Sequence, residues 1–219
     1  MSLTEQFLQV RGIARAWLLV EPNGNARPAP AVVFLHGLDD PSISEQTRRQ
    51  YQFIAERARS LGFIAAFPRG LLGALPAQSA SLGWVPVAED ENEDFICKLA
   101  DVLVCDHNAD ATRLVLAGFS NGALLVAKVL LKATPFTSFF LSAGGELELA
   151  ACPKTHRRPP VYVQIGLEDP YHLTPVRRML DRLRSFGWFD GQTLLTVEHP
   201  GGHAFYEGDF DKAWKFLTS

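Results

Sequence analysis

The sequence predicts a three-layer α/β fold, with helices on both faces of a mostly parallel sheet, an antiparallel edge at its N-terminal end and no cap domain. Short apolar runs rich in β-branched and aromatic residues alternate with longer segments of helical apolar spacing. Parallel strands require such crossover connections, which are right-handed. The length of 219 residues suits one sizeable core, so we expect residues 1–219 to form a single domain.

The first half of the chain contains the edge and the beginning of the parallel sheet. Ser42 and Glu45 fit a capping box, which predicts a helix that Gly62 ends. Residues 69–86 form a long Gly/Pro/Ala/Ser-rich loop, of a length that is usually functional or mobile. The strands expected before this loop are residues 7–10, 14–20, 31–35 and 63–67.

The second half continues the alternation. The acidic run at 89–94 is interpreted as the first turn of a helix, where negative charge favours the dipole, rather than as a metal site. Thr174 and Pro175 fit the N-cap and first residue of another helix, which Gly187 ends. Its four arginines are interpreted as a solvated face rather than an anion site. We expect one strand that ends at Gly118, and further strands at 138–143, Val161–Gly166 and 193–197. A closing helix is expected at 210–217.

The composition excludes several classes of partner. Hydrophobic residues make up 47% of the chain and charged residues 21%, as in ordinary globular proteins. A net charge of −3 provides no basic surface for nucleic acid or an anionic membrane. Three cysteines, an odd number without a C-x-x-C pair, predict a reducing compartment. With no visible signal peptide and no apolar stretch of membrane-spanning length, we expect a cytoplasmic protein.

Ser120 lies in the sequence Gly118-Phe119-Ser120-Asn121-Gly122, between an apolar run and a helical pattern. A G-x-S-x-G nucleophile elbow requires this strand–turn–helix context. The elbow strains the serine backbone, and a Cβ at Gly118 or Gly122 would collide with the neighbouring strand and helix. The alternative is a turn whose serine only caps the helix. We predict that Ser120 is a nucleophile at the carboxyl end of the sheet, where open α/β folds bind ligands.

A serine nucleophile needs a base in contact and a group that orients the base. His203 follows the last predicted strand and reaches the same edge as Ser120, with His199 as the reserve. Asp169 follows the strand Val161–Gly166, with Glu168 as the alternative; a Glu-Asp-Pro turn that only caps the next helix is the competing interpretation. The order serine, aspartate, histidine along the chain is that of the α/β-hydrolases.

The tetrahedral intermediate of acyl transfer needs two backbone donors. We expect one to be the N–H of Asn121, at the positive end of the helix after the nucleophile. The other is most simply the N–H of Leu38, in the loop that follows strand 31–35 and contains Gly37.

From about residue 31 to the end, the chain resembles the lidless α/β-hydrolases. The motifs that carry the resemblance are HGLDD at 36–40, GFSNG at 118–122, DP at 169–170 and GH at 202–203. The first two resemble the phospholipase/carboxylesterase branch, which includes acyl-protein thioesterases. The Ser-Asn-Gly form and DFI at 94–96 are similar to feruloyl esterases and polyhydroxybutyrate depolymerases. The resemblance implies the same roles for Ser120, His203, Asp169, Leu38 and Asn121. Two positions depart from the usual pattern, Asp39 and Ala123.

These residues together predict a serine hydrolase that cleaves carboxylic esters or thioesters through an acyl-enzyme. Acyl transfer or peptide cleavage on the same triad, and a non-catalytic binding protein of this fold, are the alternatives. No cofactor or metal is expected, since no H-E-x-x-H motif, Cys/His cluster or phosphate-cradling loop is present. We expect a small-molecule ester or thioester as substrate, and a monomer or homodimer. The residues that could line the substrate pocket are Leu72, Leu75, Trp84, Phe119, Tyr171, Phe205 and Tyr206.

Overall fold

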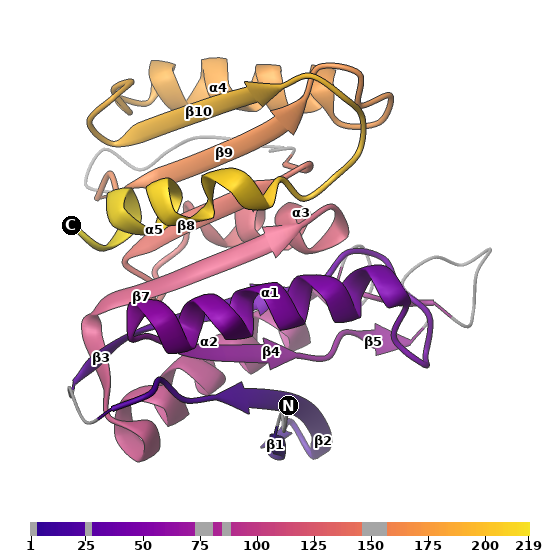
Figure 1. The fold of residues 1–219 in the computed structure, drawn as a ribbon, viewed down its shortest axis with the longest axis vertical. Coiled ribbons are helices and arrows are strands. Elements are labelled where there is room, and N and C mark those ends of the chain that lie inside the picture. Colours follow the sequence, from indigo (N-terminus) through magenta and orange to yellow (C-terminus); the bar gives the residue numbers. More distant parts are fainter. Residues whose placement is uncertain (1–3, 25–27, 73–80, 85–88, 146–156) are drawn as a thin grey trace.

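The structure is a computed structural model that describes residues 4–24, 28–72, 81–84, 89–145 and 157–219. An eight-stranded sheet lies between two layers of helices (Figure 1). Its strands are β1 (Thr4–Val10), β2 (Ile13–Val20), β3 (Ala29–Leu35), β4 (Ile64–Pro68), β7 (Ala109–Phe119), β8 (Ser138–Ser142), β9 (Val161–Gly166) and β10 (Leu194–His199). A small hairpin pairs β5 (Leu71–Leu72) with β6 (Leu82–Gly83), within the segment predicted as a long loop. The helices are α1 (Glu45–Leu61), α2 (Glu89–His107), α3 (Asn121–Val129), α4 (Leu173–Ser185) and α5 (Phe210–Thr218), with the 3₁₀ turn η1 (Glu207–Asp209) before α5.

The strand order places the predicted site at a switch point of the sheet. The order is β1-β2-β4-β3-β7-β8-β9-β10. From β4 to β10 all neighbours are parallel, whereas β2 is antiparallel to β1 and β4, which confirms the predicted sheet and its antiparallel edge. The chain proceeds from β3 to β4 on one side and later adds β7 on the other. The crevice outside the carboxyl ends of β3 and β7 is therefore where this kind of sheet binds a ligand.

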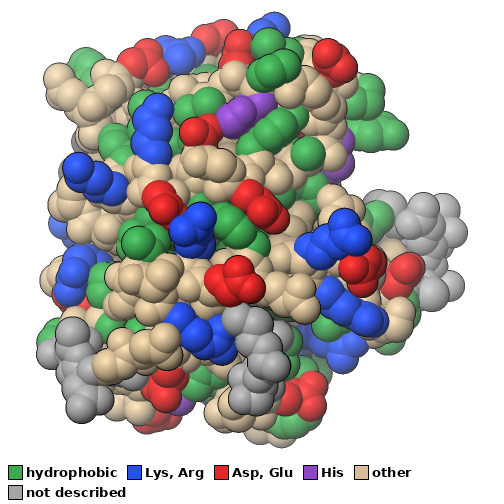
Figure 2. Space-filling model, viewed as in Figure 1, with side chains coloured by type: hydrophobic (Ala, Val, Ile, Leu, Met, Phe, Trp, Pro, Cys, Tyr) green, Lys and Arg blue, Asp and Glu red, His purple; other side chains and the backbone are tan. Residues whose placement is uncertain are grey.

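The core lies between the sheet and its helices. In Figure 1, α1 and α5 cover one face, and α2 and α3 cover the other. The middle strands β3, β7 and β9 are buried along most of their length, as continuous apolar runs predict for parallel strands covered on both faces. Acidic and basic side chains are mixed over the face that carries α1 and α5 (Figure 2). Within the described residues, no helix has both the length and the apolar character needed to cross a membrane.

Two helices begin at residues other than those predicted, because an upstream carboxylate organises each start. Ser44, not Ser42, is the N-cap of α1, and its hydroxyl accepts the N–H of Thr47. The Oδ1 of Asp39 accepts the N–H of Ser44 and so fixes this start. Helix α4 begins at Leu173 rather than after a Thr174 cap, following a turn in which Asp169 accepts backbone N–H groups. The prediction that Gly62 ends α1 is confirmed by its left-handed conformation.

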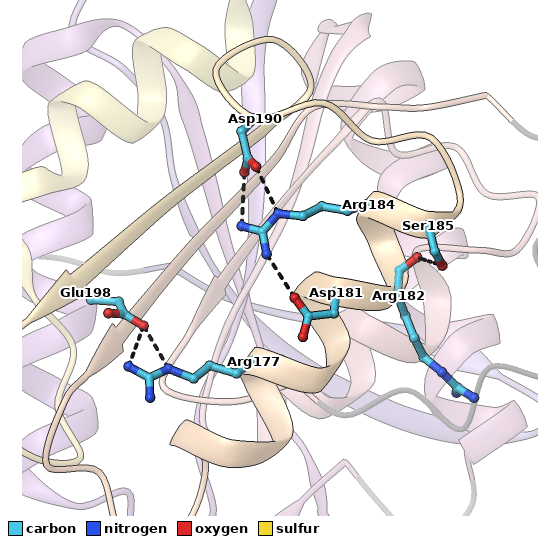
Figure 3. Close-up of polar contacts among 7 residues, drawn as sticks. All are labelled: Arg177, Asp181, Arg182, Arg184, Ser185, Asp190 and Glu198. Carbon is cyan, nitrogen blue, oxygen red and sulfur yellow. Dashed lines mark hydrogen bonds and ion pairs between the residues drawn. The ribbon is translucent and has the colours of Figure 1, made fainter.

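The charged surfaces of α2 and α4 form ion pairs with neighbouring elements. In the acidic first turns of α2, Asp94 pairs with Arg11 and Glu93 pairs with Lys132. On α4, Arg177 pairs with Glu198, and Arg184 pairs with both Asp181 and Asp190 (Figure 3). These partly exposed pairs agree with the interpretation of the α4 arginines as a solvated face. Cys97 and Cys105 both lie on α2 and are free, while Cys152 lies outside the described residues.

Candidate active site

Ser120 forms the turn between β7 and α3. Its φ of 52° and ψ of −116° lie in a region that non-glycine residues rarely adopt. A Cβ on Gly118 would come within 2.5 Å of the backbone of Gly122, and a Cβ on Gly122 would overlap the carbonyl oxygen of Leu35, which confirms the predicted steric need for glycine. Ser120 occupies the N-cap position of α3, but its side chain makes no capping hydrogen bond, so the hydroxyl does not serve to cap the helix.

His203 lies between Ser120 and Asp169. The distance from its Nε2 to the Oγ of Ser120 is 2.9 Å, and the distance from its Nδ1 to the Oδ2 of Asp169 is 2.7 Å. An ionised carboxylate only accepts hydrogen bonds, so Nδ1 must donate to Asp169. In the neutral imidazole, Nε2 is then an acceptor for the serine hydroxyl. The arrangement suits proton transfer from Ser120 to His203.

The environment of Asp169 keeps its carboxylate ionised. Burial raises the pKa of Asp169, but the hydrogen bond from His203 and the backbone N–H groups of Tyr171 and His172 outweigh burial and hold the pKa below its usual value. Its Oδ1 accepts the two backbone bonds, at 2.9 Å each, and its Oδ2 faces His203. The turn after β9 thereby fixes the carboxylate that orients the imidazole.

The structure distinguishes the two reserve residues from this cluster. His199 ends β10, stacks on Tyr206 at 4.0 Å between ring centroids and lies 3.0 Å from the Oδ2 of Asp209. Glu168 contributes its backbone, whose N–H donates to the carbonyl of Gly201. Neither takes the place of His203 or Asp169 beside Ser120.

The loop after β3 packs directly against the nucleophile. A Cβ on Gly37 would lie 3.3 Å from the Cβ of Ser120, so the Gly37–Leu38 peptide borders the serine. Asn121, the second expected donor, is the first residue of α3. Leu38 is more than one-third exposed and Asn121 is buried. The oxyanion role of their N–H groups stays a prediction.

His36 organises this loop, a role that inspection of the sequence missed. Its Nε2 accepts the N–H of Gly70 at 3.0 Å, so Nδ1 carries the proton and donates to the carbonyl of Gly37 at 2.6 Å. Burial lowers the pKa of His36, with smaller opposing effects from this hydrogen bond and from Asp39, so the ring stays neutral. The C=O and N–H of a trans peptide point in opposite directions. By holding the carbonyl of Gly37, His36 turns the N–H of Leu38 the other way.

A buried network joins this loop to α2 and α3. Trp84 donates its backbone N–H to the side chain of Asn121 and its indole N–H to the carbonyl of His36. Asn92 donates to the carbonyl of Trp84 and accepts from Arg15 on β2. Trp84 has no exposed surface, so it lies beneath the site, which differs from the prediction that it lines the pocket. The position of Asn121 directly after the nucleophile was the one sequence signal for this network.

The other predicted pocket residues fall into two groups. Phe119 and Tyr171 lie against His203, at 5.1 and 5.8 Å between ring centroids, and Tyr171 is largely exposed. In the second group, Phe205 packs against Phe119, at 6.5 Å between ring centroids, and against Phe34 and Phe140. Tyr206 donates to the carbonyl of Gly202, the residue before His203, and Leu72 borders a separate hollow beside Arg69. Leu75 lies outside the described residues.

Sequence inspection also missed His172, whose ring is 5.2 Å from that of His203. In the part of the chain that the structure describes, no group of three or more His, Cys, Asp or Glu is placed to hold a metal ion.

The strand order and the strand–turn–helix elbow at Ser120 are those of an α/β-hydrolase fold. The described residues contain no cap domain. Solved structures share this fold. An S-formylglutathione hydrolase from Staphylococcus aureus has a TM-score of 0.72 at 14% identity, covering 100% of this chain and 99% of that one. The Bacillus cereus carboxylesterase has a TM-score of 0.69 at 16% identity, covering 93% of each chain. A fluorophosphonate-binding serine hydrolase of S. aureus has a TM-score of 0.69 at 13% identity, covering 100% of this chain and 98% of that one.

Sequence comparison finds a distant relation. No family model matches the chain. The bifunctional acetylxylan esterase/xylanase of Neocallimastix patriciarum is 22% identical over 159 residues, which are 73% of this chain and 22% of that protein. The chain therefore spans about a fifth of the length of this curated relative.

Proposed function

We propose that this protein is a serine hydrolase that cleaves carboxylic esters or thioesters, with Ser120 as nucleophile, His203 as base and Asp169 as the orienting acid. The observation that carries the proposal is the bridge that His203 makes, 2.9 Å from the serine Oγ and 2.7 Å from the aspartate Oδ2. The α/β-hydrolase fold, shared with a carboxylesterase and other hydrolases, supports it. The distant acetylxylan esterase relative is consistent with an ester substrate.

The geometry supports an acyl-enzyme reaction. The Oγ of Ser120 bonds to the substrate carbonyl carbon while its proton passes to the Nε2 of His203. The carbonyl oxygen becomes an oxyanion facing the N–H groups of Leu38 and Asn121, each worth about 3 kcal/mol of transition-state stabilisation. The bond to the leaving alcohol or thiol then breaks, and Nε2 returns the proton to the departing atom. Water, deprotonated by His203, releases the acid from the acyl-enzyme by the same steps.

A fluorophosphonate probe tests this assignment. Wild-type protein should be labelled at Ser120 and should hydrolyse p-nitrophenyl acetate, and Ser120→Ala should lose both properties while unfolding at the same temperature. A folded wild type that is not labelled would favour a binding protein, and labelling with transfer of the acyl group to an added alcohol in preference to water would favour an acyltransferase.

We further propose that the substrate is a small ester, because the described part of the site carries no cap and the ring of Tyr171 beside His203 is open to solvent. Short acyl p-nitrophenyl esters should be turned over faster than long ones, as a chain-length series measures. A maximum at the long-chain end of the series would contradict this. The reducing compartment predicted from the cysteine count, and with it a cytoplasmic location, belongs to the same proposal.

A further inference from the structure

The backbone of the loop after β3 is held on both sides of Leu38. Before it, the Nδ1 of His36 donates to the carbonyl of Gly37 at 2.6 Å. After it, the N–H of Asp39 donates to the carbonyl of Leu82 at 3.0 Å, and the N–H of Leu82 donates to the carbonyl of Asp39 at 2.7 Å. The two planar peptides that flank the Cα of Leu38 are therefore both fixed by hydrogen bonds.

The N–H of Leu38 itself makes no hydrogen bond within the described residues. The preceding Gly37 packs against the nucleophile, because a Cβ on this glycine would lie 3.3 Å from the Cβ of Ser120. A backbone N–H is a strong donor, and here it stays available in a loop whose neighbouring peptides are held. An oxyanion requires this combination of a free donor and a fixed backbone.

Asp39 is one of the two positions at which the chain departs from the hydrolases it resembles. Its side chain is buried, and its Oδ1 accepts the N–H groups of Asp40 and Ser44 at 2.9 Å each. Burial raises the pKa of Asp39, but the hydrogen bonds from Ser44 and Asp40 outweigh burial and hold the pKa below its usual value. The carboxylate therefore stays ionised, and an ionised acceptor makes the stronger hydrogen bonds. Asp39 is thus tied to the start of α1 by its side chain and to β6 by its backbone.

The segment that pairs with Asp39 also supports Asn121, the second expected donor. Trp84, two residues after Leu82, donates its backbone N–H to the side chain of Asn121 at 2.7 Å. Residues 82–84 therefore bond to the neighbour of one expected donor and to the side chain of the other. This shared support holds the N–H groups of Leu38 and Asn121 in a fixed relation to each other.

We propose that Asp39 is a positioning residue for the oxyanion, because its carboxylate and its bridge to Leu82 fix the peptide that aims the N–H of Leu38. The inference rests on the proposed function, since this N–H acts only if Ser120 attacks an ester. An oxyanion forms when the Oγ of Ser120 bonds to the carbonyl carbon, and again when water attacks the acyl-enzyme. A misaimed donor slows both steps alike, so kcat should fall while KM changes little.

Asp39→Ala, which removes the acceptor for the N–H of Ser44, tests the inference. Hydrolysis of p-nitrophenyl acetate is measured per active site, counted by complete fluorophosphonate labelling. We expect kcat to fall about tenfold or more with KM nearly unchanged, since a shift of about 1 Å in a positioned group can cost about 100-fold. Asp39→Asn keeps an acceptor oxygen and should retain most of the wild-type kcat.

A trifluoromethyl ketone gives a second readout, because its adduct with Ser120 places an oxyanion where the substrate places one. Its inhibition constant should rise in Asp39→Ala by about the factor by which kcat/KM falls. An unchanged inhibition constant would mean that the variant leaves the oxyanion donors as they were, and would overturn the inference.

Ser44→Ala is the matched control for folding stability. It removes the hydroxyl that accepts the N–H of Thr47 at the start of α1, but it keeps the backbone N–H that Asp39 accepts. The unfolding temperature should fall by about 2–4 °C, the effect of one lost helix cap, with kcat per active site unchanged. Equal kcat values for Ser44→Ala and Asp39→Ala, or an Asp39→Asn as slow as Asp39→Ala, would overturn the inference and leave the proposed function intact. A wild type that hydrolyses no ester would overturn both.

Discussion

The two sides of the candidate site are held in place by different means. On the β3–β7 side, the loop of His36 and the elbow of Ser120 rest on a network in which His36, Trp84, Asn92 and Asn121 are all buried. On the β9–β10 side, residues 201–206 are all partly exposed. That loop is fastened at a few points, among them the bond from Tyr206 to Gly202 and the stacking of Tyr206 on His199.

The difference follows the chemistry that each side is proposed to perform. Backbone donors stabilise an oxyanion only if they are aimed before charge develops, so their supports benefit from a rigid, water-excluded setting. The imidazole must instead accept a proton from Ser120, donate it to the leaving group and then deprotonate a water molecule. We therefore expect substitutions on the β3–β7 side to cost folding stability, and substitutions on the β9–β10 side to cost activity.

Asp169→Asn gives the sharpest test of the β9–β10 side. An amide in place of the carboxylate would present a donor or a weaker acceptor to Nδ1, and His203 would lose its orientation and tautomer. We expect kcat for p-nitrophenyl acetate to fall about 10⁴-fold, with a modest change in unfolding temperature. Glu168→Gln is the matched control, since its backbone rather than its side chain fastens the loop, and should retain activity. If Glu168→Gln loses activity and Asp169→Asn retains it, Glu168 rather than Asp169 is the orienting acid.

Gly122→Ala tests the β3–β7 side through sterics alone. The added Cβ would overlap the carbonyl oxygen of Leu35, so backbone must move. We expect the free energy of unfolding to fall by about 3 kcal/mol or more, at the upper end of overpacking effects. Gly208→Ala, where a Cβ meets nothing within 4 Å, should change stability by less than about 0.5 kcal/mol. Equal denaturation curves for the two variants would contradict the close approach of β3 and α3.

The pH dependence of stability tests the neutral state of His36. Burial lowers its pKa in the folded protein, so below about pH 6.5 the unfolded chain binds a proton that the folded chain refuses. Stability therefore falls as the pH falls through this range, by up to about 1.4 kcal/mol per pH unit, until the pH reaches the folded pKa. His36→Asn should remove this component, so the difference between the two stability curves should shrink toward acid pH. Curves that stay parallel would mean that His36 titrates alike in both states.

The same contrast explains what could be predicted from the sequence. The alternation of apolar runs and helices predicts the sheet, and strands ending at one edge predict that Ser120, Asp169 and His203 lie near one another. The residues that hold this triad and its loops in place could not be predicted in the same way, because they depend on contacts between distant segments. One example is the hydrogen bond from Arg15 to Asn92, which are 77 residues apart. Local capping rules failed at Ser42 and Thr174 for a related reason: carboxylates upstream, at Asp39 and Asp169, already bond the backbone there. The bridge between Asp39 and Leu82 also joins distant segments and leaves no mark in the sequence pattern.

Of these substitutions, Tyr206→Phe should have the smallest effect, and it tests whether the β9–β10 loop is held less rigidly than the elbow. The substitution removes the hydroxyl that donates to the carbonyl of Gly202, at 2.9 Å, and keeps the ring that stacks on His199. One partly exposed hydrogen bond is worth about 1 kcal/mol, so we expect stability to fall by about that amount or less. Because Gly202 precedes His203, kcat should fall several-fold while KM changes little. Tyr171→Phe, which alters an exposed ring beside His203, is the matched control and should leave stability unchanged. If Tyr206→Phe costs as much stability as Gly122→Ala, the β9–β10 loop is as rigidly built as the elbow, and its partial exposure is no measure of its freedom to move.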